Sequence, residues 1–288
     1  MQFKKLLKSH GQAMSKKNNW EDFWLDGSNR DLLLGIDNPK CWEDISWKVG
    51  LEQWKGIFDS LAPGSKILEC GCGSATVSRY MAGYGYEATV LDYTESSIKL
   101  AKAGFIKKGL KANYVLGDIY KLPFEDNSFD VVFSGGVLEY FENYEIPISE
   151  MIRVLRPGGI FAANMVPRKF SIQTVADWQR TAAHSIKALL KGNFNDIFNS
   201  VNLVPKHYNI NSATLADYEN AAKNSGLDNI ETRCITPFPL LSLPLSLQKK
   251  YVQYILQHLD PWRKFNDSDK AWKHFIGMTY MIFGSKSS

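Results

Sequence analysis

The segment Ile67–Gly73 constrains the fold of this chain more than any other stretch of its sequence. It reads as a short apolar strand that runs into an acidic turn with two glycines. Gly71 and Gly73 can adopt backbone angles that are closed to residues with a Cβ, and they let a ligand approach the main chain closely. The carboxylate of Glu69 stands where a cation could bind. The segment therefore predicts a nucleotide-type ligand at the end of a sheet strand.

Two further acidic residues follow expected strands. Asp92 ends a strand over residues 87–92, about as far downstream as a nucleotide fold places the acid that binds ribose hydroxyls. Asp118 follows a third strand, over residues 112–117. Each has a structural alternative, because Asp92 could simply cap the next helix and Asp118 could belong to a plain turn. Their shared position after strands favours a ligand site.

The glycine spacing separates two possible ligands. A dinucleotide fingerprint has a third glycine and offers helix N-terminal amides to a pyrophosphate. In this chain the pattern is Gly71-x-Gly73-x-x-Thr76, and Glu69 would repel phosphate groups. A ligand with an adenosine ribose, no phosphate and a positively charged amino acid end suits this turn better. The residues therefore favour S-adenosylmethionine over NAD.

Residues 47–167 resemble a class I S-adenosylmethionine-dependent methyltransferase of the small-molecule branch, which includes the ubiquinone and menaquinone biosynthesis methyltransferases. Five segments in the right order carry this resemblance. They are Glu69-Cys70-Gly71-Cys72-Gly73, Asp92, Gly117-Asp118-Ile119, Leu122-Pro123-Phe124 with Ser128-Phe129-Asp130-Val131-Val132, and Val154-Leu155-Arg156-Pro157-Gly158-Gly159. Many relatives carry Leu-Glu-His after the fourth strand, whereas this chain has Leu138-Glu139-Tyr140, so no histidine role transfers to that position.

The resemblance implies a Rossmann-like, doubly wound α/β fold: a seven-stranded sheet, mostly parallel with an antiparallel last strand, plus helical cap insertions. It also implies direct methyl transfer to a small organic acceptor, with release of S-adenosylhomocysteine. Asp92 would accept the ribose hydroxyls and Asp118 the adenine amino group, whereas Glu69 would approach the methionine end unless it merely caps the next helix. The cofactor site is expected to comprise Glu69, Gly71, Gly73, Asp92, Tyr93, Asp118, Ile119 and Ser134.

The acceptor is expected beside the loop after the fourth strand and in the insertions. A catalytic residue is not assigned, because a sulfonium methyl donor is already activated and mainly needs alignment and exclusion of water. The candidates are Tyr140, His184 and His207. The two histidines are included because imidazole titrates near neutrality. The residues expected to contact the acceptor are Glu139, Tyr140, Trp178 and Tyr208. All of these side chains could instead serve packing or the surface.

The chain is divided into an N-terminal arm, residues 1–45, and a methyltransferase domain, residues 46–288, with cap insertions at about 168–211 and 237–272. In the second insertion the spacing of Leu247, Tyr251, Ile255 and Leu259 predicts one face of a helix. Strands are expected near 66–70, 87–92, 112–117, 129–134, 159–165, 229–235 and 275–283. Helices are expected near 47–58, 75–83, 95–108, 146–155, 171–190 and 212–225.

Composition argues against nucleic-acid binding, metal binding and a membrane span. The chain has 288 residues, with 34 basic and 30 acidic ones, and this balance lacks the concentrated positive charge of a nucleic-acid-binding protein. The four cysteines show no paired metal-ligand spacing and predict reduced thiols in a cytoplasmic protein without a bound metal. No stretch reaches the length of a membrane span, although Lys249 and Lys250 beside an apolar helix face permit peripheral membrane contact.

Three other functions and the oligomeric state are left open. RNA or protein methylation would use the same donor, but no appended RNA-binding module or basic stripe is evident. A non-catalytic S-adenosylmethionine-binding protein would keep the same binding residues without turnover. The acceptor itself, whether a specialised metabolite, a quinone-like ring or an amine, is not determined by the sequence.

Overall fold

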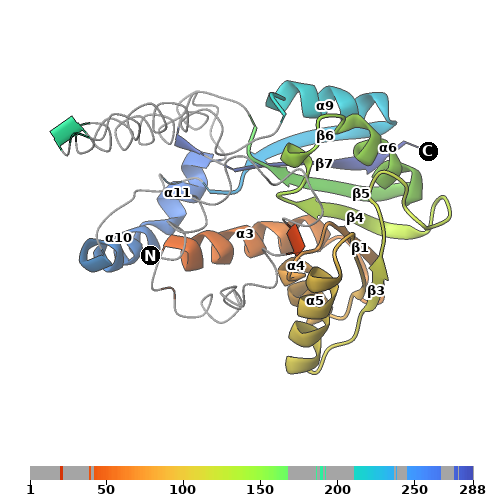
Figure 1. Cartoon of the computed structure of the whole chain (residues 1–288), viewed down its shortest axis with the longest axis horizontal. Helices are drawn as coiled ribbons and strands as arrows, with labels where there is room; N and C mark the ends of the chain where they lie inside the picture. Colours follow the sequence, from red (N-terminus) through yellow and green to blue (C-terminus); the bar gives the residue numbers. More distant parts are fainter. Residues whose placement is uncertain are drawn as a thin grey trace.

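Alternating apolar strands and amphipathic helices build a seven-stranded sheet flanked by helices in the computed structural model (Figure 1). The structure describes the region that resembles a methyltransferase, residues 47–167, without a gap. The structure describes residues 42–167, 211–236, 245–266 and 279–287, together with residues 20–21, 39, 186, 189–190, 192, 238 and 276–277.

The strand order is β3-β2-β1-β4-β5-β7-β6, and the first five strands of the sequence run parallel. β7 lies between β5 and β6 and is antiparallel to both. The predicted fold class is therefore confirmed, including its antiparallel last strand. The strands are β1 Lys66–Cys70, β2 Glu87–Asp92, β3 Asn113–Leu116, β4 Phe129–Gly135, β5 Leu155–Met165, β6 Leu227–Cys234 and β7 Tyr280–Lys286.

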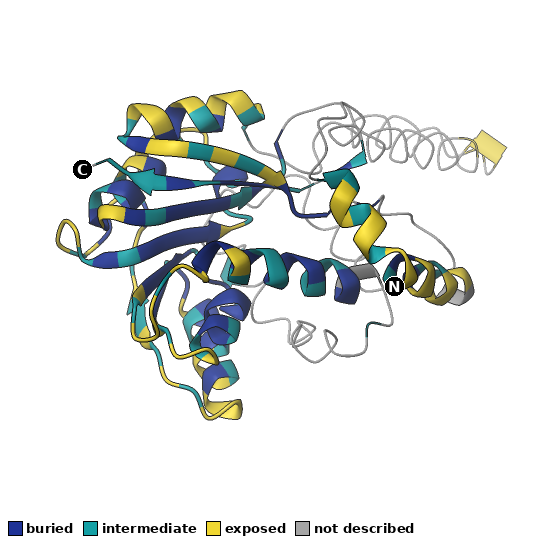
Figure 2. Cartoon of the chain, turned by 180° about the vertical axis from the view of Figure 1, so that it is seen from behind, coloured by how far each residue is buried: buried dark blue, intermediate teal, exposed yellow. Residues whose placement is uncertain are grey.

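Helices cover both faces of the sheet (Figures 1 and 2). One face carries α3 Trp42–Phe58, α4 Thr76–Ala82 and α5 Glu95–Lys107, and the other carries α6 Glu145–Val154 and α9 Leu215–Asn224. A short 3-10 helix, η2 Leu138–Tyr140, follows β4. Two more helices, α10 Leu245–Gln257 and α11 Leu259–Asn266, lie at the far end of α3 from the sheet.

The central strands are buried on both sides because helices pack on both faces. In β4, Phe133 points towards α3, where its ring lies 5.2 Å from that of Trp54. Its neighbour Val132 points to the opposite face, into the core shared with α6 and α9. This alternation explains why the strand reads as a nearly continuous apolar run in the sequence.

The strand order places the ligand crevice. β1 pairs with β2 on one side and β4 on the other, so the direction of winding reverses at β1. In open parallel sheets, ligands bind outside the carboxyl ends of the strands at such a point. The predicted site residues that follow β1, β2, β3 and β4 therefore gather at one edge of the sheet.

Two details of the expected elements are wrong. The last strand begins at Tyr280 and continues to Lys286, whereas the apolar run predicted residues 275–283. In α10, Ile255 is buried, but Leu247 is 47% exposed and does not share its face. A spacing of four residues drifts by about 40° per step around a helix, so the predicted row winds off the packed face over its length.

Much of the predicted arm and caps lies outside the described residues. Of residues 1–45, the structure describes only Trp20, Glu21, Pro39 and the start of α3. Of residues 168–211 it describes only Ile186, Leu189–Leu190, Gly192 and Asn211. The division of the chain into arm, domain and caps stays a prediction.

Candidate functional site: the carboxyl edge of the sheet

The glycine turn after β1 is fastened to the end of β2. Gly71 has φ +70° and Gly73 has φ +50°, so both use the left-handed region that favours glycine. The amides of Gly71 and Cys72 both donate to the carbonyl of Leu91, at 2.8 and 3.0 Å. The amide of Gly73 donates to Asp92 Oδ2 at 3.0 Å. Three consecutive amides of this turn are thus used inside the protein and are not offered to a pyrophosphate.

Glu69 is buried beneath this turn and caps the first turn of α4. Its Oε2 accepts a hydrogen bond from the amide of Ser78 at 3.1 Å. Burial raises the pKa of Glu69 to about 7, against the lowering effects of the Ser78 hydrogen bonds and the nearby charge of Arg79. The structure therefore gives Glu69 the helix-capping role that the sequence left as an alternative. That role is compatible with ligand contact, since a carboxylate has several acceptor positions.

Asp92 connects the turns after β1 and β2. Besides the Gly73 bond, its Oδ1 accepts from the Thr94 amide at 3.0 Å and the Thr94 hydroxyl at 2.9 Å. The side chain is 5% exposed, and burial raises its pKa despite these bonds. Ser97 also bonds to this carboxylate, which offers about four acceptor positions.

Acidic side chains gather around Tyr93. Burial and then the negative charges of Asp92, Asp118 and Glu21 raise the pKa of its hydroxyl. Asp118 is exposed and accepts from the Tyr120 amide at 2.9 Å, whereas Ile119 is buried in the core. This part of the edge therefore carries a negative potential, which favours a cationic ligand over an anionic one.

Two buried polar side chains stand at the end of β4. Ser134 is fully buried, and within the described part of the chain its hydroxyl has no hydrogen-bond partner. Glu139 is 3% exposed, its Oε2 is likewise without a partner there, and the Val166 amide donates to its carboxylate. Burial raises the pKa of Glu139 to about 8. Buried polar atoms without partners are uncommon and mark positions where a ligand group can bind.

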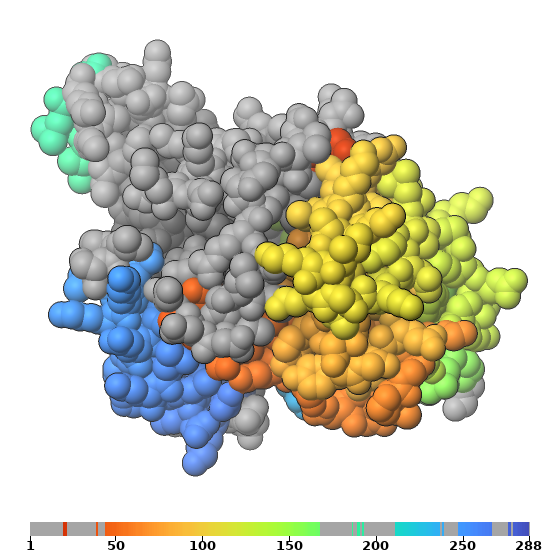
Figure 3. All heavy atoms as spheres, turned by 90° about the horizontal axis from the view of Figure 1, so that it is seen from below, coloured from red at the N-terminus to blue at the C-terminus, as the bar shows by residue number. Residues whose placement is uncertain are grey.

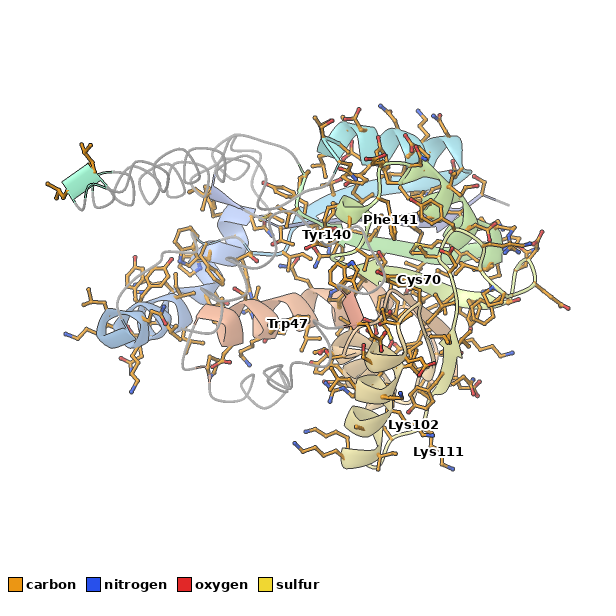
Figure 4. The ribbon with its side chains drawn as sticks, in the orientation of Figure 1. Trp47, Cys70, Lys102, Lys111, Tyr140 and Phe141 are labelled. Atoms are coloured by element: carbon orange, nitrogen blue, oxygen red, sulfur yellow. The ribbon has the colours of Figure 1, made fainter. Side chains whose placement is uncertain are left out.

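Trp20 and Glu21 bridge the two sides of this edge. The ring of Trp20 lies edge-on to Tyr140, with 5.0 Å between ring centroids, and Tyr140 belongs to η2 after β4 (Figure 4). Glu21 Oε1 accepts from the Ser96 amide at 2.9 Å, in the first turn of α5 after β2. The N-terminal segment thus contacts both walls of the crevice at adjacent residues. The sequence predicted an arm here but gave no signal for the cap on α5.

Asn211 is a site residue that the sequence analysis missed. Its Nδ2 donates to the carbonyls of Leu138 and Phe141, at 3.0 and 2.8 Å, and thereby fixes both ends of η2. Its Oδ1 accepts from the hydroxyl of Tyr218 in α9 at 3.1 Å. No local pattern marks this asparagine, because its partners lie about 70 residues earlier in the chain.

Four of the predicted residues cannot be placed. Trp178, His184, His207 and Tyr208 lie outside the described residues. Within the described ranges, no group of three His, Cys, Asp or Glu side chains is arranged to hold a metal ion.

Comparison with protein families identifies the domain that this edge belongs to. Residues 68–163, from β1 to the end of β5, match the family described as methyltransferase domain. Residues 68–163 are a methyltransferase domain. Glu69, the glycine turn, Asp92 and Asp118 all fall within it, whereas β6 and β7 lie outside it.

Curated relatives of the methyltransferase domain act on small molecules according to their names. A 2-methyl-6-phytyl-1,4-hydroquinone methyltransferase from Synechocystis is 31% identical over 149 residues, which cover 50% of this chain and 42% of the relative. A demethylmenaquinone methyltransferase from Staphylococcus haemolyticus is 40% identical over 101 residues, which cover 34% of this chain and 41% of the relative. The matches span about half or less of these relatives' own lengths.

Solved structures share the fold at low sequence identity. A phosphoethanolamine N-methyltransferase from Haemonchus contortus, solved with S-adenosyl-L-methionine, has a TM-score of 0.57 and 17% identity. The match covers 93% of this chain and 60% of that one. Within the described ranges, each helix of this chain is too short or too polar to cross a bilayer.

Proposed function

We propose that this protein transfers a methyl group from S-adenosylmethionine to a small organic acceptor and releases S-adenosylhomocysteine. The acidic edge of the methyltransferase domain carries this proposal. Glu69, Asp92 and Asp118 end or follow three adjacent strands, β1, β2 and β3, beside a glycine turn whose amides are already bonded within the protein. This arrangement suits a cationic adenosine ligand and disfavours the phosphates of a dinucleotide.

The residues present fit such a donor from end to end. Asp92, at the end of β2, is the carboxylate that would accept the ribose hydroxyls, beside its contacts with Gly73, Thr94 and Ser97, and Asp118 with Ile119 would border the adenine. Ser134 supplies a buried hydroxyl without a partner in the described structure, near the end of β4. When bound, the donor supplies an activated sulfonium methyl group.

The chain then has to align the acceptor and exclude water. Trp20 packs on Tyr140 of η2, and Asn211 holds both ends of η2, so these residues are suited to enclose an acceptor at this edge. Glu139 offers one carboxylate oxygen that is unpartnered within the described structure, which suits an acceptor with a hydroxyl or amino hydrogen. Quinone-like rings, specialised metabolites and amines all fit this description, and the names of the curated relatives support the first.

A donor-labelling experiment tests methyl transfer itself. Purified protein is incubated with methyl-labelled S-adenosylmethionine and panels of hydroquinones, phenols and amines, with RNA and a protein mixture as further arms. We expect label in a small molecule. Label found only in RNA or protein would show that the acceptor is a macromolecule and not a small molecule. Tight S-adenosylhomocysteine binding with no labelled product from any acceptor would favour a non-catalytic binding protein.

Asp92→Asn is expected to weaken S-adenosylhomocysteine binding about tenfold to a hundredfold in calorimetry. The substitution removes charge from a carboxylate whose hydrogen bonds to ribose are each worth about 1.5–3 kcal/mol. Asparagine is preferred over alanine because its Oδ1 can still accept from Thr94, although its Nδ2 cannot accept from the Gly73 amide, whereas alanine would leave both residues unbonded.

Asp130→Asn is the matched control for that variant. Asp130 also accepts a backbone amide, that of Lys66 at 2.6 Å, but it lies at the opposite edge of the sheet. We expect the control to bind S-adenosylhomocysteine like the parent protein. Unchanged affinity in Asp92→Asn would remove the ribose assignment.

Trp20→Ala is expected to weaken S-adenosylhomocysteine binding by up to about tenfold, because an aromatic pair contributes about 0.5–1.5 kcal/mol beyond its buried area. Hydrogen exchange at Trp20 and Glu21 should slow when S-adenosylhomocysteine is bound, and NAD at the same concentration should have no effect. Tyr84→Ala removes a ring from another aromatic pair, with Tyr80, and should leave affinity unchanged. Equal slowing by NAD would contradict a role of this segment in donor binding.

A further inference from the structure

The inner face of α10 is fully used in packing. Val252 and Ile255 are buried against Ile45 and Val49 of α3 and against Phe238. Tyr251 and Leu259 are partly buried at the margin of the same cluster. This small core fixes which side of α10 turns away from the protein.

The outer face of α10 combines apolar side chains with lysines. Leu247 is 47% exposed and Tyr254 is 50% exposed, and residues seven apart in a helix lie on the same side, two turns from each other. Lys250, three residues after Leu247 and four before Tyr254, lies on this same side and is exposed, whereas exposed Lys249 lies about 160° around the helix from Leu247. The ring of Tyr254 packs at 4.3 Å from that of His258, which holds it at the surface.

Some basic side chains of α10 and α11 have no ion pair in the part of the chain that the structure describes. Arg263 of α11 pairs with Glu52 and Asp260. Lys249, Lys250 and Lys264, in contrast, have no carboxylate within ion-pair distance among the described residues. The two helices project together as a lobe at one corner of the molecule (blue in Figure 3).

A second apolar group lies at the same end of the molecule. Ile186, Leu189 and Leu190 follow the i, i+3, i+4 spacing of one helix side and are 59%, 55% and 83% exposed. Figures 1 and 3 place this short helical piece at the same end of the molecule as α10.

We infer that the outer face of α10, together with Ile186, Leu189 and Leu190, docks on a lipid bilayer with anionic headgroups. A lysine such as Lys250, whose apolar stem flanks leucine and tyrosine side chains, suits the boundary between headgroups and acyl chains, and Lys249 adds positive charge at the other flank of the helix. A symmetric contact with a second copy would bring two lysine-bearing faces together, which like-charge repulsion disfavours. The inference is independent of the methyl acceptor, because no residue of this face belongs to the proposed donor site.

Sedimentation with vesicles tests this docking. The full chain is mixed with phosphatidylcholine vesicles with and without phosphatidylserine, and the bound fraction is measured. We expect binding to the phosphatidylserine vesicles only, weakened by salt. Lys249→Glu with Lys250→Glu should reduce binding at least tenfold, since each lysine near an anionic surface contributes about fivefold and each glutamate adds repulsion.

Two further variants test the tyrosine ring and the position of the charge change separately. Tyr254→Ser keeps the net charge and should reduce binding severalfold through the loss of its interfacial ring. Lys102→Glu with Lys111→Glu makes the same charge change at the far end of α5 (Figure 4) and should bind like the parent protein. All variants should keep the parent's melting temperature and its affinity for S-adenosylhomocysteine, so a failed donor site would be recognised separately.

Several outcomes would overturn the inference. These are no binding of the parent protein to either vesicle, equal losses in the α5 and α10 charge variants, and full binding by Tyr254→Ser together with Leu190→Ser. Concentration-dependent dimers that Tyr254→Ser abolishes, with no vesicle binding, would assign the face to a second copy instead.

Discussion

Gly71→Val is expected to abolish S-adenosylhomocysteine binding and to lower the melting temperature by about 10 °C. Valine at φ +70° costs about 1–3 kcal/mol of backbone strain. A Cβ at this position would also lie 2.7 Å from Val137 Cγ2, and such overpacking costs about 1–3 kcal/mol more. At about 2–4 °C per kcal/mol for a domain of this size, the sum gives the expected shift. The sequence alone pointed to ligand space, whereas the structure shows that Val137 occupies it.

Gly64→Val isolates the cost of backbone strain. Gly64 has φ +88°, and no other residue comes within 4 Å of the position that a Cβ would take, so valine there is strained but not crowded. We expect a smaller loss of melting temperature and normal ligand affinity, measured by thermal unfolding and calorimetry. Adding Val137→Ala to Gly71→Val should recover part of the lost stability. Ligand binding by Gly71→Val at the level of Gly64→Val would contradict the role of this turn.

Glu139→Gln is expected to change how stability depends on pH. The folded-state pKa of Glu139 is about 8, above its ordinary value of 4.5, because the carboxyl is buried. The folded state therefore binds this proton more tightly than the unfolded state, and the protein loses stability as pH rises from about 4.5 to about 8. A shift of this size corresponds to about 5 kcal/mol. Glutamine stays neutral, so the variant should unfold at a higher temperature than the parent above pH 8.

Thermal unfolding between pH 5.5 and pH 8.5 measures this difference. The parent and the Glu139→Gln variant should differ least at the acidic end of this range and most at its alkaline end. The variant will still lose some stability as pH rises, because burial also raises the pKa of Glu69, to about 7, and ionisation of Glu69 destabilises the fold in the same way. Glu142→Gln, an exposed carboxylate on the neighbouring loop, should follow the parent at every pH. Parallel curves for the parent and Glu139→Gln would show that Glu139 is not buried as a neutral acid.

Local patterns in the sequence determined most of the fold. Apolar runs that end in Glu69-Cys70-Gly71, in Asp92 and at Asp118 predicted β1, β2 and β3, because side-chain burial and glycine geometry act within a few residues. The same residues predicted the methyltransferase domain, which the family comparison confirms. The last strand was misplaced because its apolar run begins before the sheet pairing that defines β7.

Only the tertiary structure decided how the site residues are used. Glu69 turns to the amide of Ser78, Glu21 reaches Ser96 across 75 residues of sequence, and Asn211 fixes a loop about 70 residues earlier. Leu247, which spacing assigned to a packed face, is exposed on the same side of α10 as Lys250. Sequence patterns indicate which residues can be buried and which can adopt the backbone conformation of a tight turn. Which partner each one meets depends on the packing of distant segments, and hydrogen bonds between such segments leave no periodic signal.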